Sequence, residues 1–174
     1  MFDPTAYENM KVIIEGSLYD RDLDGEITIL DRNDIINMAK LSRTYEISFA
    51  IRNEDVVKCT FSLSAELKNL AAELLPSSKS TLLSGSRIQI GFQLDHPSQK
   101  EIDVLIEREL KSIWGNERSI KQMIHINPSI PVERIHKVIT IEFNRLVFED
   151  QIDDMVAMVD YMILSLRKIR KFAS

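Results

Sequence analysis

The sequence predicts an α+β fold, a two-layer sandwich in which helices pack on one face of a mainly antiparallel sheet. Segments of alternating apolar and polar residues occur in adjacent pairs separated by short turns, which is typical of antiparallel hairpins. Segments with helical spacing are interspersed between these pairs. The longest helical pattern follows a strand-like segment near the C-terminus, within 138–171. The expected order of elements is therefore ββαββαβαββα.

Length and composition fit one globular domain. The chain has 174 residues, of which 44% are hydrophobic and 28% are charged. This balance excludes an intrinsically disordered chain, and no apolar run approaches the roughly 20 residues of a transmembrane helix. The polar segment 76–86 is the best candidate for a connection, and it would divide the single domain 1–174 into subdomains 1–75 and 87–174.

Charge and cysteine content indicate the compartment and the class of partner. Cys59 is the single cysteine, so no internal disulfide can form, which is consistent with a reducing compartment. The N-terminus lacks the basic segment and apolar core of a signal peptide, so we expect a cytoplasmic protein. A formal net charge of −5 makes nucleic acid an unlikely main partner.

The first third of the chain predicts a hairpin followed by a helix. Residues 11–19 are rich in β-branched side chains, and the turn Asp24-Gly25 is a strong hairpin signal before a second strand at 27–29. Asp31 is a suitable helix N-cap, with an acidic residue three positions later. We therefore expect a helix over 31–41.

The next segments predict the clearest strand pair of the chain. Apolar and polar residues alternate over 45–51 and again over 57–63, on both sides of a polar turn. Cys59 belongs to the apolar alternation, so we interpret it as a small core residue rather than a nucleophile. A helix is expected over 64–74, where leucines recur at helical spacing.

The remaining elements follow from similar patterns. Residues 87–95 alternate as a strand, and the segment from Ser98 to Glu101 matches a capping box that begins a helix to about residue 114. Strands are expected over 120–126 and 137–143. The final helix is expected over 150–171, with acidic residues in its first turn and basic residues in its last turn, as the helix dipole favours.

One acidic stretch resembles the twelve-residue calcium loop of the EF-hand family. Its first, third and fifth positions are aspartates, its sixth is Gly25, its seventh supplies a backbone carbonyl and its eighth is Ile27. The resemblance implies a Ca²⁺ site, although the twelfth position is an aspartate where the family has a glutamate. The alternative is a hairpin turn rich in aspartate, because aspartate and glycine suit turns. The implied ligands are Asp20, Asp22, Asp24, Glu26 and Asp31.

Catalytic patterns are scarce in the sequence. The three histidines, His96, His125 and His136, lie far apart along the chain, and no two have the i, i+4 spacing of a helical metal site. Neither a nucleophile elbow nor a dinucleotide-binding glycine fingerprint is present. No catalytic or cofactor-binding residue is therefore predicted, and the sequence favours a protein that is not an enzyme.

The C-terminal helix has a wider apolar face than one sheet requires. Its apolar residues span an arc of about 160°, whereas packing on a sheet needs a stripe of about 100°. Either another helix of the same chain, such as 98–114, covers the surplus edge, or a second subunit does. The residues of this edge are Met155, Met158, Met162 and Ile169.

Two classes of function remain open. The surplus apolar edge favours a non-enzymatic interaction or regulatory module that self-associates, for example as a homodimer, or that binds a protein partner. The alternative is a small-ligand or cation-binding protein that uses the acidic stretch 20–31. A broad apolar surface would favour the first class, and a cavity with converging polar groups would favour the second.

Overall fold

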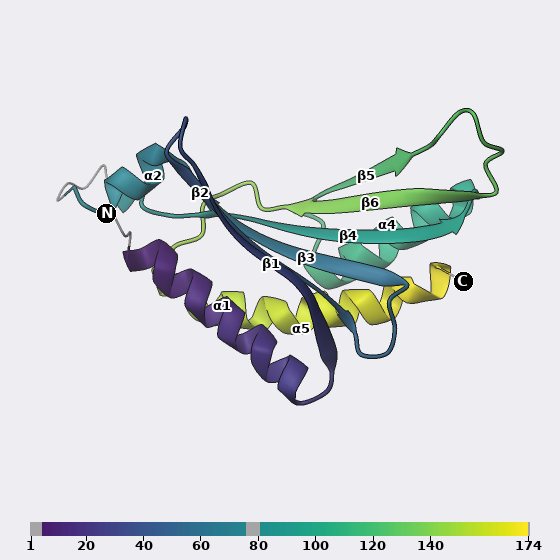
Figure 1. Ribbon diagram of the computed structural model, residues 1–174, viewed down its shortest axis with the longest axis horizontal. Helices are drawn as coiled ribbons and strands as arrows, with labels where there is room; N and C mark the ends of the chain where they lie inside the picture. The colour runs from purple at the N-terminus through teal and green to yellow at the C-terminus, as the bar shows by residue number, and fades with distance from the viewer. Residues whose placement is uncertain (1–4, 76–80, 174) are drawn as a thin grey trace.

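The sheet has six antiparallel strands among the described residues, in the spatial order β1-β2-β3-β4-β6-β5. The computed structural model describes residues 5–75 and 81–173. Helices α1, α4 and α5 lie on one face, and none of the described helices covers the other face (Figure 1). The predicted α+β class is confirmed.

The elements are α1 (Thr5–Leu23), β1 (Ile27–Asn37), β2 (Ser42–Ile51), β3 (Val57–Ala65), α2 (Leu67–Ala72), β4 (Arg87–Pro97), α4 (Lys100–Trp114), β5 (Ser119–His125), β6 (Arg134–Glu142), and α5 (Ile152–Ile169), with short 3-10 turns at Glu149–Gln151 and Arg170–Phe172.

Alternation along the central strands separates a core face from an open face. On β3, Val57, Cys59, Phe61 and Leu63 are buried while the residues between them are partly exposed. Because successive side chains of a strand point to opposite faces, one face of the sheet meets the helices and the other stays polar. Burial raises the pKa of the Cys59 thiol, and this residue packs in the core as predicted.

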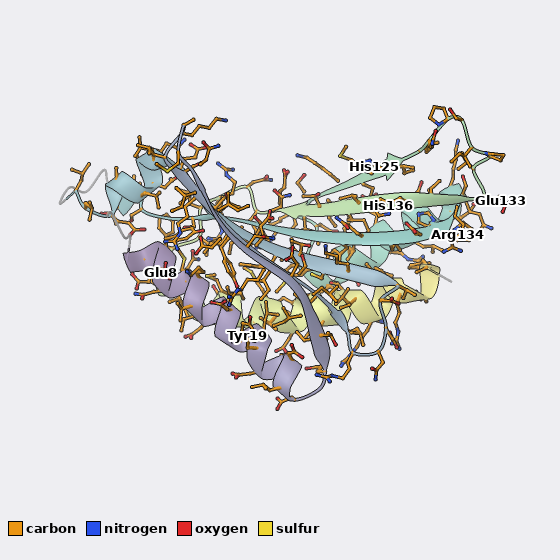
Figure 2. The ribbon with its side chains drawn as sticks, viewed as in Figure 1. Glu8, Tyr19, His125, Glu133, Arg134 and His136 are labelled. Atoms are coloured by element: carbon orange, nitrogen blue, oxygen red, sulfur yellow. The ribbon has the colours of Figure 1, made fainter. Side chains whose placement is uncertain are left out.

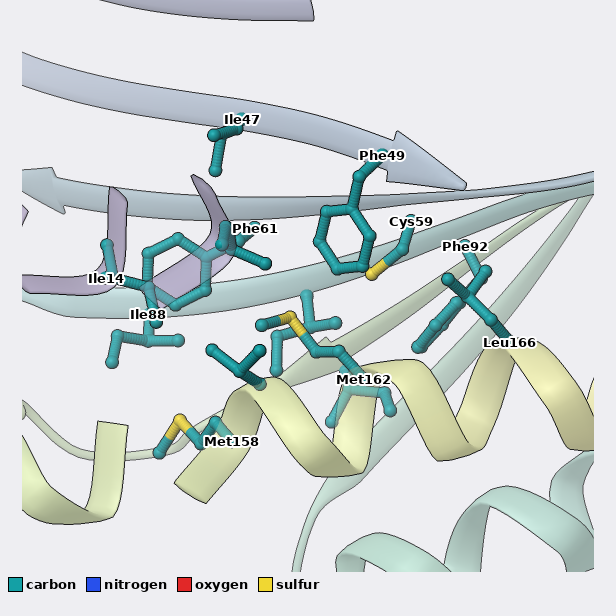
Figure 3. Packing of buried hydrophobic residues seen from close by; sticks show 14 of the residues in the cluster. Ile14, Ile47, Phe49, Cys59, Phe61, Ile88, Phe92, Met158, Met162 and Leu166 are labelled. Carbon is teal, nitrogen blue, oxygen red and sulfur yellow. The ribbon is translucent and has the colours of Figure 1, made fainter. Parts of the chain in front are cut away.

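Helix α5 lies between α1 and α4 and packs on the core face of the sheet. Figure 3 shows Met158, Met162 and Leu166 of this helix facing sheet residues that include Phe49 and Phe92. Its acidic first turn and basic last turn match the prediction. None of the described helices combines the length and apolar character that crossing a membrane requires.

The first predicted strand is in fact a helix. Residues 11–19 belong to α1, although Val12 and its neighbours have β-branched side chains. Tyr7, Met10, Ile14 and Leu18 are completely buried, and their spacing of three and four residues places them on one face of a helix. Packing of this stripe on the sheet and on α5 outweighs the local β preference.

The first predicted helix, over 31–41, is also wrong. Most of it belongs to β1, which pairs with β2 from Ile27 opposite Ile51 to Asn37 opposite Ser42. The register shifts between Ile29 and Asp31, which marks a β-bulge. Pairing along the whole of β2 stabilises the extended chain here. The sequence of β1 does not alternate between apolar and polar residues, because this edge strand is exposed over most of its length.

The other predicted elements agree with the structure to within a few residues. The strand pair 45–51 and 57–63 corresponds to β2 and β3, and the later strands and helices follow in the expected order. Strands β3 and β4 are hydrogen-bonded neighbours, so the strands on either side of the polar segment 76–86 belong to one sheet. Residues 76–80 of that segment lie outside the described part of the chain.

Charged groups attach α1 to the edge of the sheet. The Lys11 ammonium lies 2.6 Å from the carboxylate of Glu8 and 2.9 Å from that of Asp34. Arg43 donates two hydrogen bonds to Asp34, and its guanidinium lies 4.9 Å from the centre of the Tyr7 ring. Hydrogen bonds from Arg43 and Lys11 lower the pKa of Asp34 to about 2. This network fixes α1 over β1 and β2.

Candidate functional site

The four residues predicted as a subunit interface are buried inside the chain. Met155, Met162 and Ile169 are completely buried, and Met158 is 7% exposed. Helices α1 and α4 flank α5, so the alternative in which the same chain covers this edge describes the structure. These side chains pack in the core and are not available to a second subunit.

The acidic stretch 20–31 does not fold as a loop. Asp20 and Asp22 belong to the last turn of α1, and Gly25 completes a tight turn with a φ of 80°. Strand β1 begins two residues later. Asp31 lies about 13 Å further along this strand than Ile27, at the usual rise of about 3.3 Å per residue. The preceding flank is a helix, as in the EF-hand family, but the following flank is a strand.

Two carboxylates of this stretch accept hydrogen bonds from arginines. Asp22 accepts from Arg52 at 3.0 Å, and Glu26 accepts from Arg21 at 3.0 Å and from Arg167 at 2.7 Å. Within residues 5–75 and 81–173, no three His, Cys, Asp or Glu side chains are grouped so that they could hold a metal ion. Calcium binding by this stretch stays a prediction.

An apolar surface lies at one end of the molecule, where Figure 1 places α2 and the turn between β1 and β2. Among the described residues, nine large apolar side chains of this region are at least 43% exposed. They come from the β1–β2 hairpin, from α2 and from the segments that follow it. Ile35 and Ile36 are successive residues of β1, so their side chains point to opposite faces of that strand. We call the whole set of exposed side chains at this end the apolar end surface: Ile35, Ile36, Met38, Leu41, Leu67, Leu74, Leu75, Leu82 and Leu83.

Local hydrogen bonds position this surface. The side-chain oxygen of Asn37 accepts from the backbone amides of Ala39 and Lys40, both at 3.1 Å, which closes the turn that exposes Met38. At the other side, the Asn69 side chain accepts from the backbone amide of Glu66, and its amide group donates to the backbone oxygen of residue 83 at 2.9 Å. Residue 83 is thereby held against that helix.

A groove of about 640 Å³ separates the hairpin from the start of α2. Its walls carry the charged side chains Lys40, Arg43, Glu66 and Lys68, and the partly exposed Leu67 lies among them. Charges of both signs therefore border the apolar end surface.

The second group of interest lies on the open face, at the ends of three neighbouring strands. His125 of β5 is directly opposite His136 of β6, and His136 is directly opposite Asp95 of β4. The two imidazole centres are 5.8 Å apart, and His136 Nδ1 lies 2.6 Å from an Asp95 carboxylate oxygen. Figure 2 shows the two histidines on adjacent strands. We call His125, His136 and Asp95 the histidine row.

A hollow of about 400 Å³ adjoins the histidine row, with His136 and Asp95 in its wall. Arg134 also lines it and donates hydrogen bonds to the backbone oxygens of Asp95 at 2.9 Å and Ala173 at 2.8 Å. Lys58 of β3 also lines the hollow. The hollow is open to solvent and offers imidazole, carboxylate and cationic groups to a small polar ligand.

A buried polar cluster lies on the core face of the same three strands. The Lys137 side chain is completely buried beneath α4, and its ammonium contacts the carboxylate of Asp103 and the Gln122 side chain. Gln122 donates in turn to the backbone oxygen of Asp103 at 3.0 Å. His96 lies at the same end, completely buried, with Nδ1 2.7 Å from the backbone oxygen of Pro97. Its Nε2 has no hydrogen-bond partner in the part of the chain that the structure describes.

Burial lowers the pKa of His96 below its usual value, and the nearby positive charge of Lys137 adds to this effect. The unfolded chain takes up a proton on this residue near pH 6.5, whereas the folded chain does so at lower pH. The contribution of His96 to the free energy of unfolding is thus fully present above about pH 6.5 and is lost as the pH falls through the folded-state pKa.

We expect urea denaturation at pH 7.5 and pH 5.5 to show a lower free energy of unfolding at the acidic pH. In the His96→Gln variant this difference should become smaller, whatever the absolute stability of the variant. If the wild type and His96→Gln lose the same free energy of unfolding between pH 7.5 and pH 5.5, groups other than His96 cause the acid sensitivity.

The histidine row was not predicted from the sequence, because His125, His136 and Asp95 lie far apart along the chain. Residues 119–125 and 134–142 form a hairpin, and its register puts His125 opposite His136. Strand β6 then lies beside β4 instead of following it in the chain, which adds Asp95. The hairpin register was a usable signal, but the neighbourhood of β4 and β6 depends on the whole sheet.

Comparison with known proteins gave no relative. No protein-family model, no curated protein and no solved structure matches the chain.

Proposed function

We propose that the protein is a non-enzymatic interaction module that self-associates through the apolar end surface. The observation that carries this proposal is the gathering of exposed apolar side chains from three separate segments at one end of the molecule. Soluble monomers rarely expose large contiguous apolar patches, and larger ones mark contact sites for proteins or membranes. Met38 and Leu82 are the most exposed members, at 76% and 73%.

A second copy of the chain is the partner that this surface fits best. In a two-fold symmetric dimer the same patch meets itself, so it needs apolar area at its centre and charges of both signs at its border. Lys40, Lys68 and Glu66 supply such a border. Strand β1 also lies at the free edge of the sheet beside this surface, so its outward backbone groups are placed for additional pairing.

The proposal is tested by sedimentation velocity over a wide range of protein concentration. We expect the wild-type mass to rise with concentration from 20.1 kDa toward twice that value. The double variant Met38→Asp/Leu82→Asp should remain at the monomer mass, because two charges would be buried in the contact. Both sites are exposed, so circular dichroism should show an unchanged fold.

The control variant carries the same charges elsewhere. Leu23→Asp/Val104→Asp changes residues that are 85% and 68% exposed, at the end of α1 and on α4. It should associate as the wild type does. A wild-type chain that stays monomeric at every concentration would refute self-association, and an equal loss in the control would refute the assignment to this surface.

A further inference from the structure

We propose that His125 and His136 form a zinc-binding site, with Asp95 as the residue that orients one of the two imidazoles. The site lies at the end of the sheet away from α2 (Figures 1 and 2), so it is independent of the proposed self-association. Imidazole nitrogen is a preferred ligand of Zn²⁺, whereas Ca²⁺ and Mg²⁺ prefer oxygen.

The distance between the two rings fits a shared ion. A zinc–nitrogen bond is about 2.0 to 2.1 Å long, and the ring centre lies about 1.1 Å behind the nitrogen, so each centre would lie about 3.2 Å from the ion. Two such centres are about 5.2 Å apart at the tetrahedral angle and about 6.4 Å apart when the rings oppose each other. The observed 5.8 Å lies between these limits.

Asp95 selects the tautomer that a metal requires. The Nδ1–H of His136 donates to the Asp95 carboxylate at 2.6 Å, so the lone pair lies on Nε2 and is available to an ion. Metal-ligating histidines usually donate their other N–H to a carboxylate or a carbonyl, which fixes the ring and raises its basicity. The side chains of His136 and Asp95 are 45% and 64% exposed, so an ion can reach them from solvent.

The remaining coordination positions belong to water. Within the described ranges no third His, Cys, Asp or Glu completes a set of protein ligands, and the hollow beside His136 gives space for water molecules. A two-imidazole site with open positions binds its ion reversibly, unlike a closed structural zinc site with four protein ligands. The cross-strand pairing of β5 and β6 supplies both ligands from a rigid element.

The test is a titration of the untagged chain, ¹⁵N-labelled at histidine, with Zn²⁺ alone. We expect the imidazole resonances of His125 and His136 to shift and those of His96 to stay fixed, because His96 is buried on the opposite face. Calorimetry should show that His125→Gln and His136→Gln each abolish measurable binding. Asp95→Asn should weaken binding about 10-fold, since it removes only the orienting carboxylate.

Lys121→Gln is the matched control, because Lys121 is exposed on β5 on the same face as His125. It should bind Zn²⁺ with the wild-type Kd. The proposal is overturned if the His125→Gln/His136→Gln double variant keeps the wild-type Kd. It is also overturned if Zn²⁺ leaves both exposed histidine resonances unchanged at millimolar concentration.

Discussion

Asp103→Ala is expected to lower the free energy of unfolding by about 3 kcal/mol, because it leaves the buried ammonium of Lys137 without its carboxylate. Lys137 has no exposed surface, whereas the Asp103 side chain is 35% exposed. Removing the carboxylate should therefore cost more stability than removing the ammonium. Lys137→Met should be close to neutral or stabilising, because Asp103 can be hydrated and a methionine side chain fills a similar volume.

Urea denaturation measures both variants, and Glu101→Ala is the matched control. Glu101 lies in the same first turn of α4 and is exposed, so its loss reports only the interaction with the helix dipole, about 0.3–1 kcal/mol. In the double variant Asp103→Ala/Lys137→Met, most of the lost stability should return. If Asp103→Ala and Glu101→Ala lower the free energy of unfolding equally, the buried ammonium of Lys137 does not require the Asp103 carboxylate.

Met162→Ala should cost about 2–5 kcal/mol of stability, because it opens a cavity where α5 meets the sheet. The side chain is completely buried and belongs to the central apolar cluster. The same substitution at a subunit contact would instead leave the folded monomer intact and reduce only its association. This variant therefore separates a core role from the interface role that the sequence suggested.

Leu164→Ala, on the outer face of the same helix, is the control for the change in side-chain size. Leu164 is 40% exposed, so its loss should change stability by about 0.5 kcal/mol or less. Denaturant titration of both variants at one protein concentration gives the comparison. Similar costs at both positions would contradict the packing of α5 described above.

The sequence predicted the parts of the fold in which local pattern and tertiary packing agree. Alternation in β2 and β3 and the helical arc of α5 were both interpreted correctly, because these elements bury one clear face. In α1, the β-branched run at Val12 concealed a helical stripe that begins at Tyr7. In β1, acidic residues that suit a helix start lie on an exposed edge strand, so neither burial nor alternation marked it.

The candidate sites were less predictable because each depends on partners that the chain order does not place together. The apolar edge of α5 was identified, but the helix that covers part of it, α1, was predicted to be a strand. His125 and His136 become neighbours only in the β5–β6 register, and Lys137 meets Asp103 only when α4 lies over β6. The apolar end surface required knowledge of which leucines stay uncovered.

The position of β6 between β4 and β5 has a consequence for synthesis on the ribosome. Strands β1 to β4 emerge first and can pair in chain order, but the second edge of β4 has no neighbour until residues 134–142 have been made. Helix α5, which covers the core face, emerges later still. Until then the nascent chain has an unpaired edge on β4 and an apolar sheet face that α5 does not yet cover, the state in which chaperone binding competes with aggregation.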